Sequence, residues 1–187
     1  MKNIWILLFS LTLNQVAAQN NSKVWTADNG SGWYKKNPIL HTDCSDPDVI
    51  RVKDDCYMTL SSFNSAPGLP ILHSKDLVNW SIIGHVLGKQ FPEKNFDKVQ
   101  HGIVVWVQKI QYLNNSFYIY FPDLDQGIFS PKSTDINGPL SKPILVEAGK
   151  GLIDTCPLWD TDGKAYLIFA FAGSRVGIKS DCCMKSI

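Results

Sequence analysis

Two aspartates in distant parts of the chain have the residue type and the sequence setting for acid–base chemistry. Asp46 stands in the stretch Asp46-Pro47-Asp48, directly before a β-branched run, and Asp154 stands in the stretch GLIDTCPLW. Two carboxyl groups that converge on one pocket are the arrangement used to cleave glycosidic bonds. Asp and Pro also form turns, and a turn is the simpler interpretation of Asp46 and Asp48 taken alone. The elements that carry these residues decide between the two interpretations.

A pattern of short strands and tight turns occurs three times, in residues 46–62, 107–122 and 154–171. Each copy has a strand, a turn of residues that tolerate positive φ, and a second strand rich in aromatic and β-branched residues. The expected turns are Asp54-Asp55, Asn114-Asn115 and Asp162-Gly163. A third strand, a turn and a fourth strand follow the first two hairpins, whereas residues 180–187, SDCCMKSI, do not continue a strand pattern.

Four antiparallel strands in each unit of about 50 residues are typical of β-propeller blades. The sequence therefore predicts an all-β propeller with three sheets around a common axis, the last sheet incomplete. The alternative is an all-β sandwich with similar hairpins. No helical periodicity is found after residue 20. The innermost strand of each propeller blade lines the central channel, so we expect Asp46 and Asp154, at the start of two such strands, to converge at one end of it.

Charge and the N-terminal residues restrict partners and location. The chain has 18 Lys and Arg against 17 Asp and Glu, which argues against a nucleic-acid partner or an acidic membrane surface. Residues 1–18 combine Lys2, an apolar run over residues 4–13 and small residues near Ala18, which is typical of a secretory signal peptide. The apolar run is too short to span a membrane. We expect a secreted or periplasmic protein in which residues 19–187 form the incomplete N-terminal part of a propeller domain.

The chain has five cysteines, an odd number whose spacing matches no zinc pattern. Cys56 alternates with Met58 on one face of a strand, so we expect a buried free thiol. Cys44 and Cys156 each lie two residues from a candidate aspartate. A disulfide between them requires Cα atoms within about 7 Å, and two buried thiols are the preferred prediction.

Three stretches in order resemble glycoside hydrolase family 43: NPILHTDCSDPDVIRVKDDCYM, ILHSKDLVNWSIIGHVL and GKGLIDTCPLWDTDGKAYL. The resemblance runs from about Trp25 to Ser180. It implies a five-bladed propeller, about three blades of which are present here, and an inverting exo-glycosidase acting on xylose- or arabinose-containing saccharides. Family members commonly have Ala-Pro after the position of Trp106, where this chain has Val107-Gln108.

The resemblance also implies residue roles. Asp46 corresponds to the general base that activates water, and Asp154 to the residue that raises the pKa of the general acid. Asp48 is not a catalytic position and is expected to cap the turn or to bind backbone. Trp106 follows the family motif and is a candidate substrate-binding residue. From their residue types alone, Phe63 is a second candidate, with burial in the core as its alternative role, and Arg175 a third, with pairing to a neighbour as its alternative. No metal-ligand spacing is visible and no cofactor is expected. Some family members hold an ion in the central channel, and the sequence does not show whether this chain has its ligands.

The general acid of the family is a glutamate on a later blade. The chain has only two glutamates, Glu93 and Glu147, and neither has the expected context. Glu147 is the one possible substitute. We therefore expect this chain to be a weakly active or inactive fragment, because the leaving group lacks a proton donor. The alternatives are a non-catalytic carbohydrate-binding propeller fragment and the product of a broken gene.

Overall fold

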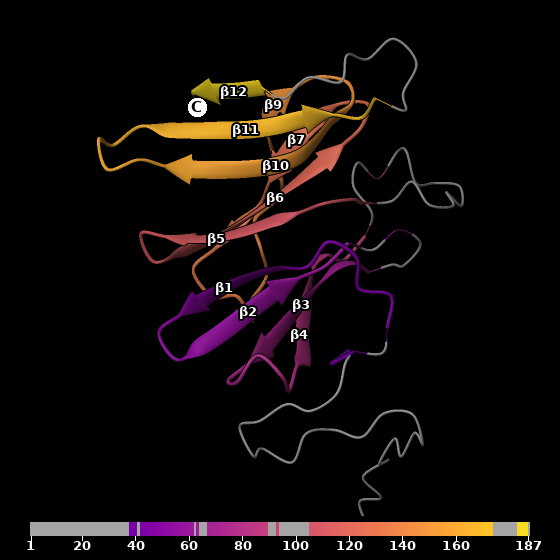
Figure 1. Ribbon diagram of the computed structural model, residues 1–187, viewed down its shortest axis with the longest axis vertical. Coiled ribbons are helices and arrows are strands. Elements are labelled where there is room, and N and C mark those ends of the chain that lie inside the picture. The colour runs from indigo at the N-terminus through magenta and orange to yellow at the C-terminus, as the bar shows by residue number, and fades with distance from the viewer. Residues whose placement is uncertain are drawn as a thin grey trace, which may run out of the picture.

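The computed structural model describes residues 38–40, 42–61, 63, 67–89, 93, 105–173 and 183–186. The expected signal peptide lies outside these residues. The described chain is built from strands, and Figure 1 shows them in three sheets that stand one above another. No α-helix is found in this part of the chain, and therefore none that is long and apolar enough to cross a membrane.

Sheet 1 is a four-stranded antiparallel sheet in the order β1-β2-β3-β4. Its strands are β1 (Asp48–Val52), β2 (Asp55–Thr59), β3 (Gly68–Ser74) and β4 (Ser81–Leu87). The turn between β3 and β4 is closed by Asp76, whose carboxylate accepts hydrogen bonds from the backbone N–H groups of Val78 and Asn79. These bonds hold the pKa of Asp76 far below its ordinary value, because they stabilise the ionised form.

Sheet 2 has the order β5-β6-β7-β9, with the short β8 paired to β6. Its strands are β5 (Lys109–Leu113), β6 (Ser116–Asp123), β7 (Gly127–Ser130), β8 (Lys132–Ser133) and β9 (Ile144–Ala148). The close approach of β9 to β7 explains why a glycine stands at position 127. Gly127 has φ 130°, and a Cβ there would collide with the carbonyl oxygen of Glu147.

Sheet 3 contains β10 (Leu152–Trp159), β11 (Ala165–Phe171) and β12 (Cys183–Ser186), in that order. The expectation that residues 180–187 form no strand was wrong, since β12 pairs with β11 over Tyr166 to Phe169. The reason is that strand pairing uses backbone N–H and C=O groups, which a polar segment also has. The predicted incomplete third sheet is otherwise confirmed.

The first two hairpins have two-residue turns as predicted, the first shifted by one residue, whereas the third has a longer loop, residues 160–164, that includes Asp162 and Gly163. The first turn consists of Lys53 and Asp54, because Val52 pairs with Asp55, and Lys53 has φ 58°. Asn114 and Asn115 form the second turn as predicted, at φ 48° and 57°. Two consecutive positive φ values match the right-handed twist of the flanking strands.

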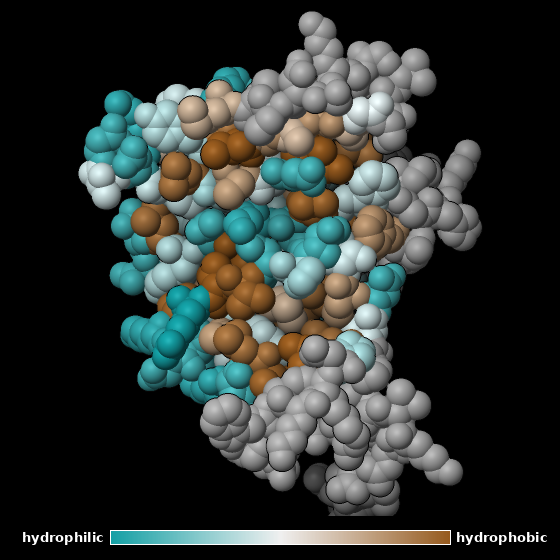
Figure 2. Space-filling view, viewed as in Figure 1, coloured by the Kyte–Doolittle hydropathy of each residue, from teal (hydrophilic) through white to brown (hydrophobic). Residues whose placement is uncertain are grey.

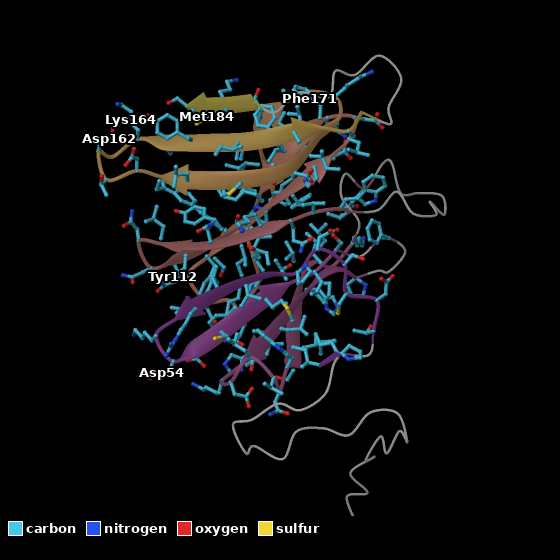
Figure 3. The ribbon with its side chains drawn as sticks, in the orientation of Figure 1. Asp54, Tyr112, Asp162, Lys164, Phe171 and Met184 are labelled. Carbon is cyan, nitrogen blue, oxygen red and sulfur yellow. The ribbon has the colours of Figure 1, made fainter. Side chains whose placement is uncertain are left out.

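The three inner strands, β1, β5 and β10, run in the same direction (Figure 1). The hairpin turns that follow them therefore share one side of the molecule. Figure 3 shows Asp54 of the first turn and Asp162 of the third on this side, with Phe171 at the opposite side. Hydrophilic residues gather over the turn side in Figure 2. The starts of the inner strands, where the candidate aspartates were predicted, lie at the side away from the turns.

Sheet 2 is buried on both faces, which a two-sheet sandwich does not allow. Along β6, Phe117, Ile119 and Phe121 belong to the apolar cluster shared with sheet 1. Tyr120 points to the other face and belongs to the cluster shared with sheet 3. This alternation with a period of two residues places β6 between two neighbouring sheets. Three sheets stacked face to face around aligned inner strands are blades of a β-propeller, and the fold prediction is confirmed.

Candidate active site

Asp46 lies two residues before β1, and its side chain is held by a residue that follows β2. The Oγ of Ser61 donates a hydrogen bond to Asp46 Oδ2 at 2.9 Å. Ser61 is buried, at 3% exposure, whereas Asp46 is exposed. One carboxylate oxygen is therefore anchored to the interior while the residue as a whole remains open to solvent.

A second side chain holds the backbone of Asp46 from the neighbouring sheet. Gln108, the residue before β5, donates from Nε2 to the carbonyl oxygen of Asp46 at 3.0 Å. Its Oε1 lies 3.2 Å from Ser61 Oγ, and the backbone N–H of Val107 donates to the same hydroxyl at 2.9 Å. Gln108 is buried, at 2% exposure. Asp46, Ser61, Val107 and Gln108 thus form one polar network between sheets 1 and 2.

The backbone of this network is strained. Asp46 has φ 50° and Val107 has φ 32°. A positive φ is uncommon for any residue other than glycine and is a genuine outlier for a β-branched one. Such conformations persist only where the surrounding structure enforces them, and they concentrate at functional sites.

Asp154 has the same unusual backbone in sheet 3. It is the third residue of β10, with φ 55°, and it lies where the register with β11 shifts between Ile153 and Cys156. Such a bulge turns a side chain away from the direction that a regular strand gives it. Leu152 pairs with Phe171, which lies at the side opposite the hairpin turns (Figure 3). Asp46 and Asp154 therefore lie toward the same end of the blades, and the convergence of their carboxylates stays a prediction.

Two of the three candidate substrate-binding residues contact each other beside Asp46. The rings of Phe63 and Trp106 have centroids 5.8 Å apart and planes inclined by 60°. Phe63 follows Ser61 by two residues, and Trp106 directly precedes Val107, so the aromatic pair adjoins the polar network. Both rings are half-buried. Arg175 lies outside the described residues.

Asp48 has a structural role, and it bonds backbone as predicted. Its Oδ2 accepts a hydrogen bond from the backbone N–H of Ile110 at 2.7 Å, and its Oδ1 pairs with Lys109 Nζ at 2.6 Å. Both partners belong to β5, so Asp48 joins the inner strands of sheets 1 and 2 two residues after Asp46. Of the two aspartates around Pro47, Asp46 belongs to the candidate site, and Asp48 connects two inner strands.

Glu147 is unsuited to replace the absent general acid. It lies on β9, the outermost strand of sheet 2, and pairs with Lys185 Nζ on β12 at 2.7 and 3.0 Å. The inner strand β5 stands at the other edge of the same sheet. Glu93 is exposed, and no contact of its side chain is found among the described residues. Glu147 therefore stands at the opposite edge of sheet 2 from the network of Asp46.

The cysteine prediction was partly wrong. Cys44, Cys56 and Cys156 are all free thiols, so no disulfide joins Cys44 to Cys156. Cys56 is buried as predicted, but Cys44 is only half-buried and Cys156 is exposed. Its neighbours Thr155 and Pro157 point into the protein, and a strand turns alternate side chains outward. Burial raises the pKa of Cys44, with a smaller contribution from the charge of Asp43.

An apolar cavity of about 720 Å³ lies elsewhere, on the face of sheet 1 that points away from sheet 2. None of the described residues that line it is an aspartate or a glutamate; they include Leu40, Cys44, Val49, Met58, Leu60 and Trp80. These residues supply no carboxyl group for acid–base chemistry. In the described part of the chain no three His, Cys, Asp or Glu side chains are grouped to hold a metal ion.

Sequence reasoning missed Ser61 and Gln108 as partners of Asp46. The departure from the family pattern at Val107-Gln108 was visible, but its consequence was not, because the hydrogen bonds join residues more than 40 positions apart. Ser61 carried no signal, since a serine after a strand is ordinary.

The described residues thus form blades of a β-propeller with two strained aspartates toward one end. The model for glycosyl hydrolases family 43 matches residues 35–184, and the chain belongs to this family. It is 39% identical over 153 residues to a beta-xylosidase of Formosa agariphila, covering 79% of this chain and 26% of that protein. It is 35% identical over 141 residues to a non-reducing end alpha-L-arabinofuranosidase of Bacteroides ovatus, covering 71% of this chain and 25% of the relative.

Solved structures give the same result. The xylan beta-1,4-xylosidase of Bacillus halodurans superposes with a TM-score of 0.67 at 27% identity, covering 80% of this chain and 30% of that one. A family 43 protein of Bacteroides ovatus gives a TM-score of 0.65 at 29% identity, covering 81% and 29%. The chain thus spans about a quarter of the length of the curated relatives it matches.

Proposed function

We propose that this chain is the N-terminal part of an exported, inverting exo-glycosidase that removes xylose or arabinose from xylan- or arabinan-derived saccharides. Asp46 is the general base that takes a proton from the attacking water. Asp154 modulates the pKa of a general acid, and the rings of Trp106 and Phe63, with Arg175, contact the sugar. The names of the relatives support the substrate class, since they are xylosidases and arabinofuranosidases.

The observation that carries the proposal is the setting of Asp46. Its Oδ2 is anchored by Ser61, while the residue is exposed at the end of the blades where Asp154 also lies. A general base requires an ionised carboxylate that is fixed in place and reachable by water. The residues described here supply a base but no glutamate beside it, so this chain alone is weakly active or inactive on unactivated substrates.

The roles of base and acid are separable by the choice of leaving group. A 2,4-dinitrophenolate departs without protonation, whereas an alkoxide requires a proton donor, and such a donor is commonly worth about 10²–10⁴ in rate. We expect the purified chain to cleave 2,4-dinitrophenyl β-D-xyloside or α-L-arabinofuranoside slowly and the methyl glycosides not at all. Asp46→Asn abolishes the slow cleavage.

Three results bear against this proposal. Turnover that is equal in the wild-type protein and Asp46→Asn excludes Asp46 as the base. Robust cleavage of a methyl glycoside shows that an acid is present in the chain after all. Binding of xylo-oligosaccharides without any Asp46-dependent cleavage favours the carbohydrate-binding fragment.

A further inference from the structure

We infer that Ser61 and Gln108 are positioning residues for Asp46, with Ser61 orienting the carboxylate and Gln108 fixing the backbone that carries it. The inference rests on the proposed role of Asp46 as the base. It adds to that role two residues from outside the Asp-Pro stretch, one from sheet 1 and one from the start of sheet 2.

The hydroxyl of Ser61 is oriented by what surrounds it. The N–H of Val107 donates to Oγ at 2.9 Å and occupies one of its lone pairs. The single hydroxyl proton then has two acceptors, Asp46 Oδ2 at 2.9 Å and Gln108 Oε1 at 3.2 Å. The carboxylate is the nearer acceptor, and a bond to an ionised group is the stronger one. Ser61 therefore directs its proton to Asp46.

The anchored oxygen determines which oxygen is available for catalysis. Oδ2 accepts the bond from Ser61, while Oδ1 accepts no hydrogen bond from the described residues. Asp46 is exposed, and a carboxylate with one oxygen fixed and the other without a protein donor is the arrangement that a base needs to receive a proton from water in one direction. Without Ser61 the carboxylate is free to rotate about the Cβ–Cγ bond.

Gln108 acts on the backbone instead. Its Nε2 donates to the carbonyl oxygen of Asp46 at 3.0 Å, and Asp46 has the strained φ of 50°. A conformation of this kind requires contacts that enforce it. Gln108 is 2% exposed and has no room to turn toward solvent, so its amide acts as a fixed clamp.

The test compares four variants of the full chain with the wild-type protein on 2,4-dinitrophenyl β-D-xyloside. These are Ser61→Ala, Ser61→Thr, Gln108→Met and the matched control Ser74→Ala. Ser74 is also a buried serine of sheet 1, but its hydroxyl serves the turn at Asp76. We expect Ser61→Ala and Gln108→Met to lower kcat about 10- to 100-fold with little change in KM, since small displacements of a catalytic group cost this much. Ser61→Thr, which keeps the hydroxyl, restores most of the rate.

Crystal structures of the same variants provide a readout that does not depend on turnover. We expect the Asp46 carboxylate to rotate in Ser61→Ala and φ of Asp46 to leave the positive region in Gln108→Met. An unmoved Asp46 in both variants overturns the inference, as does a loss of kcat in Ser74→Ala equal to that in Ser61→Ala. If the wild-type protein shows no Asp46-dependent cleavage of 2,4-dinitrophenyl β-D-xyloside or of the α-L-arabinofuranoside, the proposed function fails, and the crystal structures still decide whether Ser61 and Gln108 position Asp46.

Discussion

The junction between sheets 1 and 2 and the junction between sheets 2 and 3 arise from the same repeat but are held in different ways. The first contains eleven buried apolar residues of the described chain and is joined by Asp48 at the inner strands. The second contains five such residues, and its ion pair, Glu147 with Lys185, lies at the outermost strands. Buried polar contacts thus occur where the first junction meets the end that carries Asp46.

The two junctions use a carboxylate in different ways, Asp48 in the first and Glu147 in the second. Asp48 and Glu147 are buried to nearly the same extent, at 14% and 15% exposure, so the difference lies in their partners. Asp48 binds a backbone N–H of β5 as well as a lysine, and a bond to backbone fixes the position of the strand. Glu147 pairs only with Lys185, which is 57% exposed, and such a pair specifies little geometry.

The largest effect is expected from the apolar clusters. Ile119 in the first junction and Leu167 in the second are both fully buried. Ile119→Ala should lower the free energy of unfolding by about 2–5 kcal/mol, and Leu167→Ala should fall at the lower end of the same range. The smaller cluster relaxes more easily around a cavity, because sheet 3 has exposed side chains such as Met184.

Urea denaturation of the two variants and the wild-type protein measures both effects. A larger loss for Leu167→Ala than for Ile119→Ala would show that the second junction is the better packed one, and the comparison would then be reversed.

The next effect concerns the polar connection at the inner strands. Asp48→Ala leaves the N–H of Ile110 and the ammonium group of Lys109 without their partner, and should cost about 1–3 kcal/mol in the free energy of unfolding. Asp54→Ala is the matched control, because the Asp54 side chain is 91% exposed and pairs with Arg51 at 3.8 Å. The control should change stability by less than about 0.5 kcal/mol. If urea denaturation shows that the two variants lose equal free energy of unfolding, Asp48 does not stabilise the connection between the inner strands.

The sequence predicted those features that depend on local pattern. The alternation along β6 and the Asn114-Asn115 turn identified strands and hairpins, because side-chain period and positive φ are properties of neighbouring residues. The resemblance gave Asp46 and Asp154 as the candidate site, and their catalytic roles stay predictions. Ser61 and Gln108 were not predictable in this way, since their role depends on the packing of one sheet against another. The exposure of Cys156 was missed for a similar reason, because burial depends on which face of β10 is covered.

A smaller effect is expected at the outer strands of the second junction. Lys185 is 57% exposed and Glu147 is 15% exposed, so water weakens their attraction. A double-mutant cycle with Lys185→Met and Glu147→Gln should give a coupling energy of no more than about 1 kcal/mol, decreasing with added salt. A coupling well above this value, or one insensitive to salt, would mean that the outer strands hold the second junction as firmly as Asp48 holds the first.

The smallest effect is a pH dependence at the edge of the first junction. Asp55 Oδ1 lies 2.6 Å from Lys75 Nζ and 2.5 Å from His73 Nε2. The hydrogen bond from Lys75, and then that from His73, lower the pKa of Asp55 from its ordinary value of 3.8 in the folded protein. Tyr57 contacts the His73 ring and packs edge-on against Phe117 of sheet 2, so this group adjoins the junction.

A carboxylate whose pKa is lower in the folded state binds fewer protons there than in the unfolded state. Its contribution to stability is complete above the unfolded pKa of about 3.9 and is lost as pH falls through the lower folded value. The stability advantage of the wild-type protein over Asp55→Asn should therefore be present at pH 5 and should shrink below about pH 4. Urea denaturation at these pH values measures the difference. An advantage that persists undiminished at pH 2 would show that the bonds to Lys75 and His73 do not favour the ionised form.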